Sequence, residues 1–105
     1  MSIIYKINIT NSAQNDIIEI YDYIKFDKII AAKNWRDKIK ENIKSLLKNP
    51  FRSPIIPEAE KLKVDYRHII LGNYRIIYKI SGKIITILRV IHGARLLNTD
   101  FHCNN

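Results

Sequence analysis

The sequence predicts an α+β domain in the order β-α-α-β-β-β, with a helical hairpin covering one face of the sheet. Three observations carry this prediction: an alternating apolar stretch near the N-terminus, two stretches with apolar residues at helical spacing, and three short apolar runs separated by glycine-containing pairs. A chain of 105 residues has room for one hydrophobic core but not for two. We therefore expect a single domain over residues 1–97 and a short tail at residues 98–105.

The first strand is predicted over residues 2–10, SIIYKINIT. Its apolar and polar side chains alternate with the period of two that is typical of a half-buried strand. A helix is expected to follow through residues 12–26, with Asn11 or Ser12 as its N-cap. It carries an apolar stripe that can pack on a sheet, formed by Ala13, Ile17, Ile20, Tyr21 and Ile24.

A second helix is predicted from about Ile30 to Leu47, and Pro50 ends it. The short connection at residues 26–28 makes the two helices an antiparallel hairpin. The apolar face of the second helix holds Ala31, Trp35, Ile39, Ile43, Leu46 and Leu47. Because Trp35 shares this spacing, we interpret it as a core residue and not as part of a ligand site. Residues 51–65 contain two of the three prolines and are expected to form a loop.

Three further strands are predicted over residues 66–71, 74–80 and 83–91. Gly72-Asn73 and Ser81-Gly82 separate them, and such two-residue connections favour an antiparallel meander.

The two-residue loops set a register in which Leu71 pairs with Tyr74 and Ile80 with Lys83. One face is then mostly apolar and should receive the helices; it holds Ile69, Leu71, Tyr74, Ile76, Tyr78, Ile80, Ile85, Ile87 and Ile91, with Arg67 and Arg89 as its only charges. The other face is mixed and basic, as expected of a binding surface; it holds Tyr66, His68, Ile70, Arg75, Ile77, Lys79, Thr86, Leu88, Val90 and His92. Arg75 lies in the middle strand, opposite Ile70 and Leu88, and the three strands offer no carboxylate to pair with it.

The net charge of +8 is concentrated in the second half of the chain. Residues 61–95 contain eight lysines and arginines against one aspartate, a balance of +7, whereas residues 1–60 carry ten against eight. A basic half favours an anionic partner, either a nucleic acid or an acidic protein. A basic sheet face with a central arginine could bind such a partner or stabilise the charge that develops during phosphodiester cleavage.

The two histidines of the strand region are not expected to form an acid–base pair. In this register His68 and His92 flank Arg75 in opposite directions, roughly 20 Å apart along the strands. Arg89 falls on the apolar face, where we interpret it as a structural arginine that reaches the sheet edge or a partner carboxylate. Beyond the strand, the flexible end is expected to let Arg95 approach Arg75.

No cofactor or metal is expected, because the sequence lacks metal-ligand spacing, a serine triad and a phosphate-binding glycine loop. No apolar run is long enough to span a membrane, and the N-terminus has no export signal. The single Cys103 suits a reducing compartment, so we expect a cytoplasmic protein.

Several motifs resemble the RelE/ParE superfamily of bacterial toxins, the toxic halves of type II toxin–antitoxin operons, which are also called plasmid stabilisation proteins. The resemblance spans roughly residues 3–97. It rests on YKINIT before the first helix, a tryptophan-bearing second helix followed by NPF, and the stretches PEAEKL, YRHIILGNYRIIYKI and ILRVIHGARLL. It implies a RelE/ParE-like fold, with the helical hairpin packed on a mostly antiparallel four-stranded sheet.

The resemblance implies one of two activities in a bacterial cytoplasm. RelE-like members are mRNA interferases that cleave mRNA in the ribosomal A site without a metal; Arg75, His92, Arg95 and His68 would then be the catalytic candidates. ParE-like members inhibit DNA gyrase and are not known to cleave RNA. The RVIHGAR ending and the absence of a tyrosine after Arg95 favour the ParE-like subgroup. A third alternative is an inactive member that only binds its antitoxin.

Either toxin would use a shared set of residues to bind its target or partner: Arg67, Tyr74, Arg75, Lys79, Arg89, His92 and Arg95. The resemblance also implies a cognate antitoxin that is small, acidic and partly disordered. Such a chain would wrap the helical hairpin and the basic sheet in a hetero-oligomer.

Overall fold

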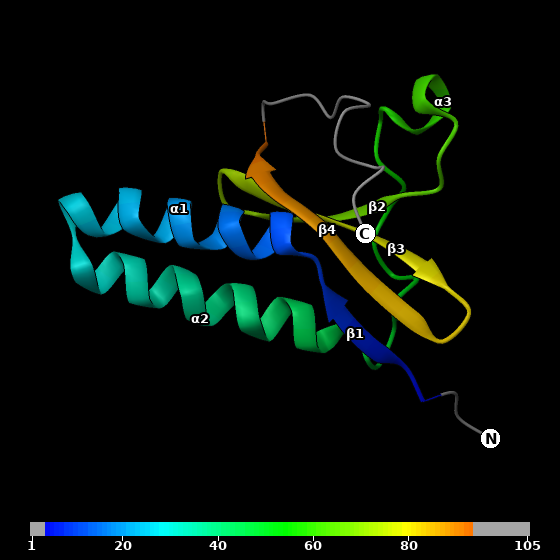
Figure 1. Ribbon diagram of the computed structural model, residues 1–105, viewed down its shortest axis with the longest axis horizontal. Helices are drawn as coiled ribbons and strands as arrows, with labels where there is room; N and C mark the ends of the chain where they lie inside the picture. The colour runs from blue at the N-terminus through cyan, green and yellow to red at the C-terminus, as the bar shows by residue number, and fades with distance from the viewer. Residues whose placement is uncertain (1–3, 94–105) are drawn as a thin grey trace.

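The structure, a computed structural model, describes residues 4–93 and confirms the predicted α+β order (Figure 1). The elements are β1 (Lys6–Ile9), α1 (Asn11–Asp27), α2 (Ile29–Ser45), α3 (Ala59–Leu62), β2 (Arg67–Leu71), β3 (Tyr74–Ser81) and β4 (Ile84–His92). The sheet has the strand order β1-β4-β3-β2. β1 pairs in parallel with β4, and the remaining pairs are antiparallel. The two long helices lie side by side on one side of the sheet, as Figure 1 shows.

The N-cap of α1 is Thr10, so the prediction of Asn11 or Ser12 was wrong. The Thr10 hydroxyl accepts a hydrogen bond from the Ala13 amide at 3.1 Å and donates one to the Leu88 carbonyl at 3.0 Å. Thr10 is therefore held by β4, a long-range contact that the local sequence pattern could not reveal. The cap joins the start of the hairpin to the sheet.

The prediction for the apolar face of the second helix is confirmed for Ile39, Ile43 and Leu46, which are buried. It was wrong for Ala31 and Leu47, which are exposed, and Ala32 is buried in place of Ala31. The half-buried Trp35 packs against the main core, which confirms its interpretation as a core residue. Within residues 4–93, neither helix is both long and apolar enough to cross a membrane.

The loop of the second hairpin is Gly82–Lys83, so the predicted pairing of Ile80 with Lys83 was wrong. Ile80 pairs with Ile85, and Ser81 pairs with Ile84. In both hairpins the glycine is the first loop residue and has a positive φ, 58° at Gly72 and 59° at Gly82. Glycine adopts this conformation without steric cost. The first turn is therefore at Gly72-Asn73 with Leu71 paired to Tyr74, as predicted, whereas the second turn lies one residue later than predicted.

A β-bulge between Ile77 and Tyr78 shifts the register again. Tyr78 pairs with Ile87 and Ile77 pairs with Arg89, so Leu88 is the extra residue on β4. Arg75 consequently pairs with Ile91 and not with Leu88, although its predicted pairing with Ile70 on β2 is confirmed.

The bulge also redistributes the end of β4 between the two faces. Val90, predicted on the basic face, packs in the core under the helices. Ile91, predicted under the helices, packs on the opposite side.

The sheet face opposite the helices is covered by other residues of the chain, so the prediction of an exposed basic face was wrong. A second apolar core lies there, formed by Ile56, Ile77, Leu88 and Ile91, with Ala59, Leu62, Val64 and Tyr66 packed against it. The segment of residues 54–66 folds back along β2, with an Ile55–Arg67 bridge and a 2.9 Å hydrogen bond from the Ile56 amide to the Tyr66 carbonyl. The predicted loop is thus an apolar cover that includes α3.

Candidate functional site

Arg75 is ion-paired with a residue of the segment 54–66, which we call the cover segment. Its side chain is 3% exposed and that of Glu58 is 9% exposed. The Arg75 Nη1 atom donates to Glu58 Oε1 at 3.0 Å, and Nη2 donates to Glu58 Oε2. The three strands supply no carboxylate for Arg75, as predicted, but Glu58, which directly precedes α3, does. Such bidentate pairing fixes the guanidinium in place.

His68 completes this buried cluster. Its Nδ1 lies 3.2 Å from Arg75 Nη1, and because an arginine nitrogen can only donate, the neutral imidazole accepts at Nδ1 and carries its proton on Nε2. Burial lowers the pKa of His68 below 6.5, the charge of Arg75 lowers it further, and Glu58 opposes the shift. The cluster therefore holds one paired cation beside a neutral histidine, at the position where the sequence predicted an open basic face.

Arg67 binds residues 51–53, the part of the chain that directly precedes the cover segment. Its Nη1 donates to the Ser53 carbonyl at 2.6 Å, and its guanidinium carbon lies 5.3 Å from the centre of the Phe51 ring. Arg67 pairs with Tyr78, which belongs to the core under the helices, so Arg67 and the next residue of β3, Lys79, lie on opposite faces of the sheet. Lys79 is four positions from Arg75 along β3 and pairs with Thr86. The structure therefore does not bring Arg67, Arg75 and Lys79 together into one cationic surface.

Arg89 is held by α1. Its Nε and Nη2 donate to Asp16 at 2.6 and 3.0 Å, and the same carboxylate accepts the Val90 amide at 3.0 Å. The hydrogen bond to Asp16 raises the pKa of Arg89 despite partial burial. Arg89 thus has the contacts of a structural arginine, and its carboxylate comes from this chain.

His92 lies beside Tyr74 and away from Arg75, so its predicted place on the basic face was wrong. Its ring centre is 5.7 Å from that of Tyr74, which in turn meets Trp35 of α2 at 5.6 Å. A hollow of about 200 Å³ adjoins this aromatic pair; its lining residues are Asp16, Glu19, Ile20, Tyr74, Val90, Ile91 and His92.

The two histidines are closer along the strands than predicted but still do not meet. His92 pairs with Tyr74 and His68 with Ile77, three positions apart on β3, or about 10 Å. They lie on opposite sides of the sheet, His68 with Arg75 and His92 with Tyr74. Arg95 lies outside the described residues, and so does its expected approach to Arg75.

An apolar groove that sequence reasoning missed lies between β1 and the helical hairpin. It has a volume of about 310 Å³. Its apolar lining comes from Ile7, Ile9, Ile17, Ile39 and Ile43, and its cationic lining from Arg36, Lys40 and Lys44. β1 is an edge strand, and on its side away from β4 no strand of the described chain pairs with it. Its isoleucines come from β1, α1 and α2, so no single stretch of the sequence indicates the groove.

Metal binding has no support from the described chain. Within residues 4–93, no three histidine, cysteine, aspartate or glutamate side chains are grouped so that they could hold a metal ion.

Comparison with known proteins identifies relatives of this arrangement. The sequence model of the family described as "ParE toxin of type II toxin-antitoxin system, parDE" matches residues 7–97. No curated protein sequence matches the chain. Among solved structures, the chain is similar to the chromosomal ParDE toxin–antitoxin system from P. aeruginosa, with a TM-score of 0.67 and 22% identity over 87% of this chain and 98% of that one.

A second structural relative is the RelBE2 toxin–antitoxin complex from Mycobacterium tuberculosis. The TM-score is 0.59 and the identity 22%, over 84% of this chain and 96% of that one. At these identities the two structures establish the fold alone.

Proposed function

Because the chain belongs to the ParE toxin family of type II toxin–antitoxin systems, and so to the RelE/ParE superfamily, we propose that it inhibits DNA gyrase and that a cognate antitoxin neutralises it. We favour gyrase over mRNA as the target because Arg75 is buried and ion-paired. A RelE-like nuclease would need this guanidinium at the scissile phosphate. Here it is 3% exposed and paired with Glu58 of the cover segment, so RNA would have to displace Glu58 to reach it.

A supercoiling assay tests this target directly. Purified chain added to DNA gyrase and relaxed plasmid should block supercoiling or accumulate cleaved plasmid. Gyrase that works unchanged at a molar excess of the chain would refute the proposal.

The second candidate function is mRNA cleavage, and the contact between Arg75 and the neutral His68 favours it. A cation that stabilises phosphate charge beside a group that can move a proton is suitable chemistry for phosphodiester cleavage. The double variant Glu58→Gln/Arg75→Met separates the two functions, because it removes the guanidinium without leaving a buried charge. Growth arrest that survives this change supports the gyrase proposal, whereas loss of both arrest and mRNA cleavage supports the nuclease.

We place the antitoxin in the groove between β1 and the hairpin. An acidic amphipathic segment would set its apolar side on the isoleucines and its carboxylates near Arg36, Lys40 and Lys44. An extended part of it could add a strand at the edge of β1.

Charge reversal at the groove tests this placement, with the product of a short acidic reading frame beside the gene as the candidate antitoxin. Lys40→Glu/Lys44→Glu should weaken binding, because both lysines are exposed and line the groove. Lys38→Glu is the matched control, since Lys38 is exposed on α2 but is not part of the groove lining. Equal binding by both variants would exclude the groove.

A further inference from the structure

The tip of the helical hairpin exposes large apolar side chains that the fold does not use. Phe26 is 95% exposed, Tyr23 77% and Ile30 71%. Tyr23 and Phe26 are three residues apart on α1, so they lie on neighbouring positions of one helix surface, and Ile30 follows at the start of α2. Large exposed apolar side chains gathered at one end of a small protein are typical of an interaction site. We call these three residues the tip patch.

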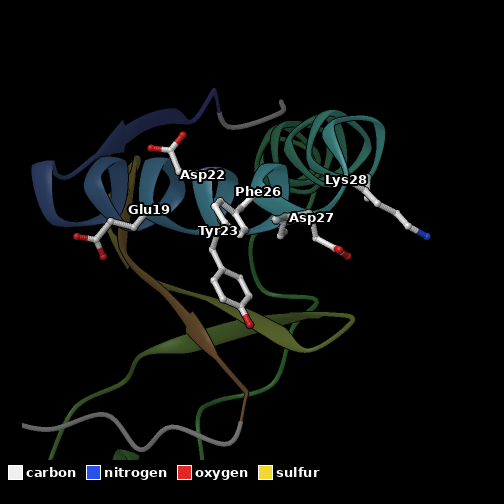
Figure 2. A pocket seen from close by; sticks show the side chains of 8 residues that line it. Glu19, Asp22, Tyr23, Phe26, Asp27 and Lys28 are labelled. Atoms are coloured by element: carbon white, nitrogen blue, oxygen red, sulfur yellow. The ribbon is translucent and has the colours of Figure 1, made fainter.

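The surroundings of the tip patch carry the opposite charge to the rest of the protein. A hollow of about 660 Å³ opens there, lined by Glu19, Asp22 and Asp27 against one cation, Lys28, together with Tyr23, Ile24, Phe26 and Ala31. This local balance of −2 lies in a chain with a net charge of +8. Figure 2 shows the ring of Tyr23 projecting from α1 and the Lys28 side chain directed away from Tyr23 and Glu19.

The carboxylates of the hollow are largely available to a partner. Asp22 meets Lys25 at 3.7 Å, an exposed pair that contributes little. Glu19 is close enough to Arg89 to add to the increase in pKa that Asp16 causes there, but among residues 4–93 neither Glu19 nor Asp27 lies within salt-bridge distance of a cationic nitrogen. Aromatic rings beside such carboxylates are the surface that a guanidinium or ammonium group prefers, because the cation stacks on the ring and pairs with the carboxylate.

We propose that the tip patch is a docking surface for a cationic protein segment that presents arginine or lysine together with apolar side chains. Nucleic acid does not suit it, because its phosphates would face three carboxylates. The surface is separate from the groove between β1 and the hairpin. Along α2, Ile30 and Lys40 are ten residues apart, which is about 15 Å. The toxin could therefore hold an acidic partner in the groove and a cationic one at the tip simultaneously, whether or not gyrase is its target.

The test is a selection of short random peptides displayed on phage, with the purified full chain as bait. Enriched peptides should combine arginine or lysine with leucine or aromatic residues. A selected peptide, labelled with a fluorophore, is then titrated by anisotropy. Tyr23→Ser/Phe26→Ser and Glu19→Lys/Asp27→Lys should each weaken its binding about tenfold or more, as truncation at an interface centre does. All four side chains are exposed or partly exposed, so both variants should fold.

Two control variants make the same kinds of substitution at positions outside the tip patch and its hollow. Ile84→Ser removes an apolar side chain, 47% exposed, from the sheet end of the molecule, and Glu41→Lys reverses an exposed charge on α2. Neither should change binding. Enrichment of acidic peptides, or equal binding by the tip variants and the wild type, would overturn the proposal. The proposal would also be overturned if the wild-type chain self-associates and Phe26→Ser abolishes this association. The tip patch would then bind a second copy of the chain and not a cationic partner.

Discussion

Replacing Glu58 with glutamine should strongly destabilise the protein. The substitution keeps the shape of the side chain but removes the charge that compensates Arg75, whose side chain is 3% exposed. Removing one partner of a buried pair leaves an uncompensated charge and typically costs about 3–5 kcal/mol. A domain of this size has a free energy of unfolding of about 5–15 kcal/mol. Glu58→Gln should therefore remove about a fifth or more of the stability and lower the urea midpoint by about 1 M or more.

Two further variants separate this effect from a general intolerance of the site. Glu58→Gln/Arg75→Met removes both charges, so it should recover most of the stability that the single substitution loses. Asp22→Asn is the exposed counterpart, because the Lys25–Asp22 side chains are 49% and 61% exposed. It should cost less than about 0.5 kcal/mol.

Urea unfolding followed by circular dichroism measures all three variants. A Glu58→Gln loss no larger than that of Asp22→Asn would refute the burial argument. A double variant as unstable as the single one would show that the charge pair is not the reason for the loss.

Three other predictions follow from the buried contacts. Tyr78→Phe should cost about 1–3 kcal/mol in urea unfolding, because it leaves a buried backbone carbonyl without its 2.7 Å hydrogen bond, while the exposed Tyr23→Phe changes nothing. The free energy of unfolding should be highest above pH 6.5 and should fall as the pH drops below that value. The reason is that burial lowers the pKa of His68 in the folded protein, so the unfolded chain binds the proton more readily than the folded one; His68→Gln should flatten this dependence. Asp16→Asn should lower the free energy of unfolding by about 2 kcal/mol in thermal denaturation, because it weakens the contacts to Arg89 and the neighbouring amide.

The elements of the fold could be predicted because each has a local cause. Gly72-Asn73 defines the first hairpin, and the isoleucine spacing of α1 and α2 defines their buried sides. The faces of the sheet had no such signal. β3 buries Ile76 and Ile77 on opposite sides, so its sequence shows no polar alternation to set the register. The bulge after Ile77 depends on packing from both faces, which no single strand pattern contains.

The contacts of the candidate site could not be predicted because they join residues far apart in the chain. Glu58 and Arg75 are separated by 17 positions, and Asp16 and Arg89 by 73. The sequence shows which side chains carry charge, but partners at such distances appear only when the cover segment and α1 are packed on the sheet. The isoleucine-lined groove depends in the same way on two helices and a strand.

The arginines of the motif that resembles the toxin superfamily are largely used by the fold itself. Arg67 binds backbone carbonyls, Arg75 binds Glu58, and Arg89 binds Asp16. Arginine suits these positions, because its planar guanidinium is always charged and forms several directed hydrogen bonds at once. Within residues 61–93, the cations that are exposed, and not half-buried or buried, are lysines: Lys61, Lys63 and Lys83. In this chain the arginine pattern therefore reflects the contacts of the fold and does not identify the target. The target of this toxin has to be determined by its exposed surfaces, of which the groove and the tip patch are the most distinctive.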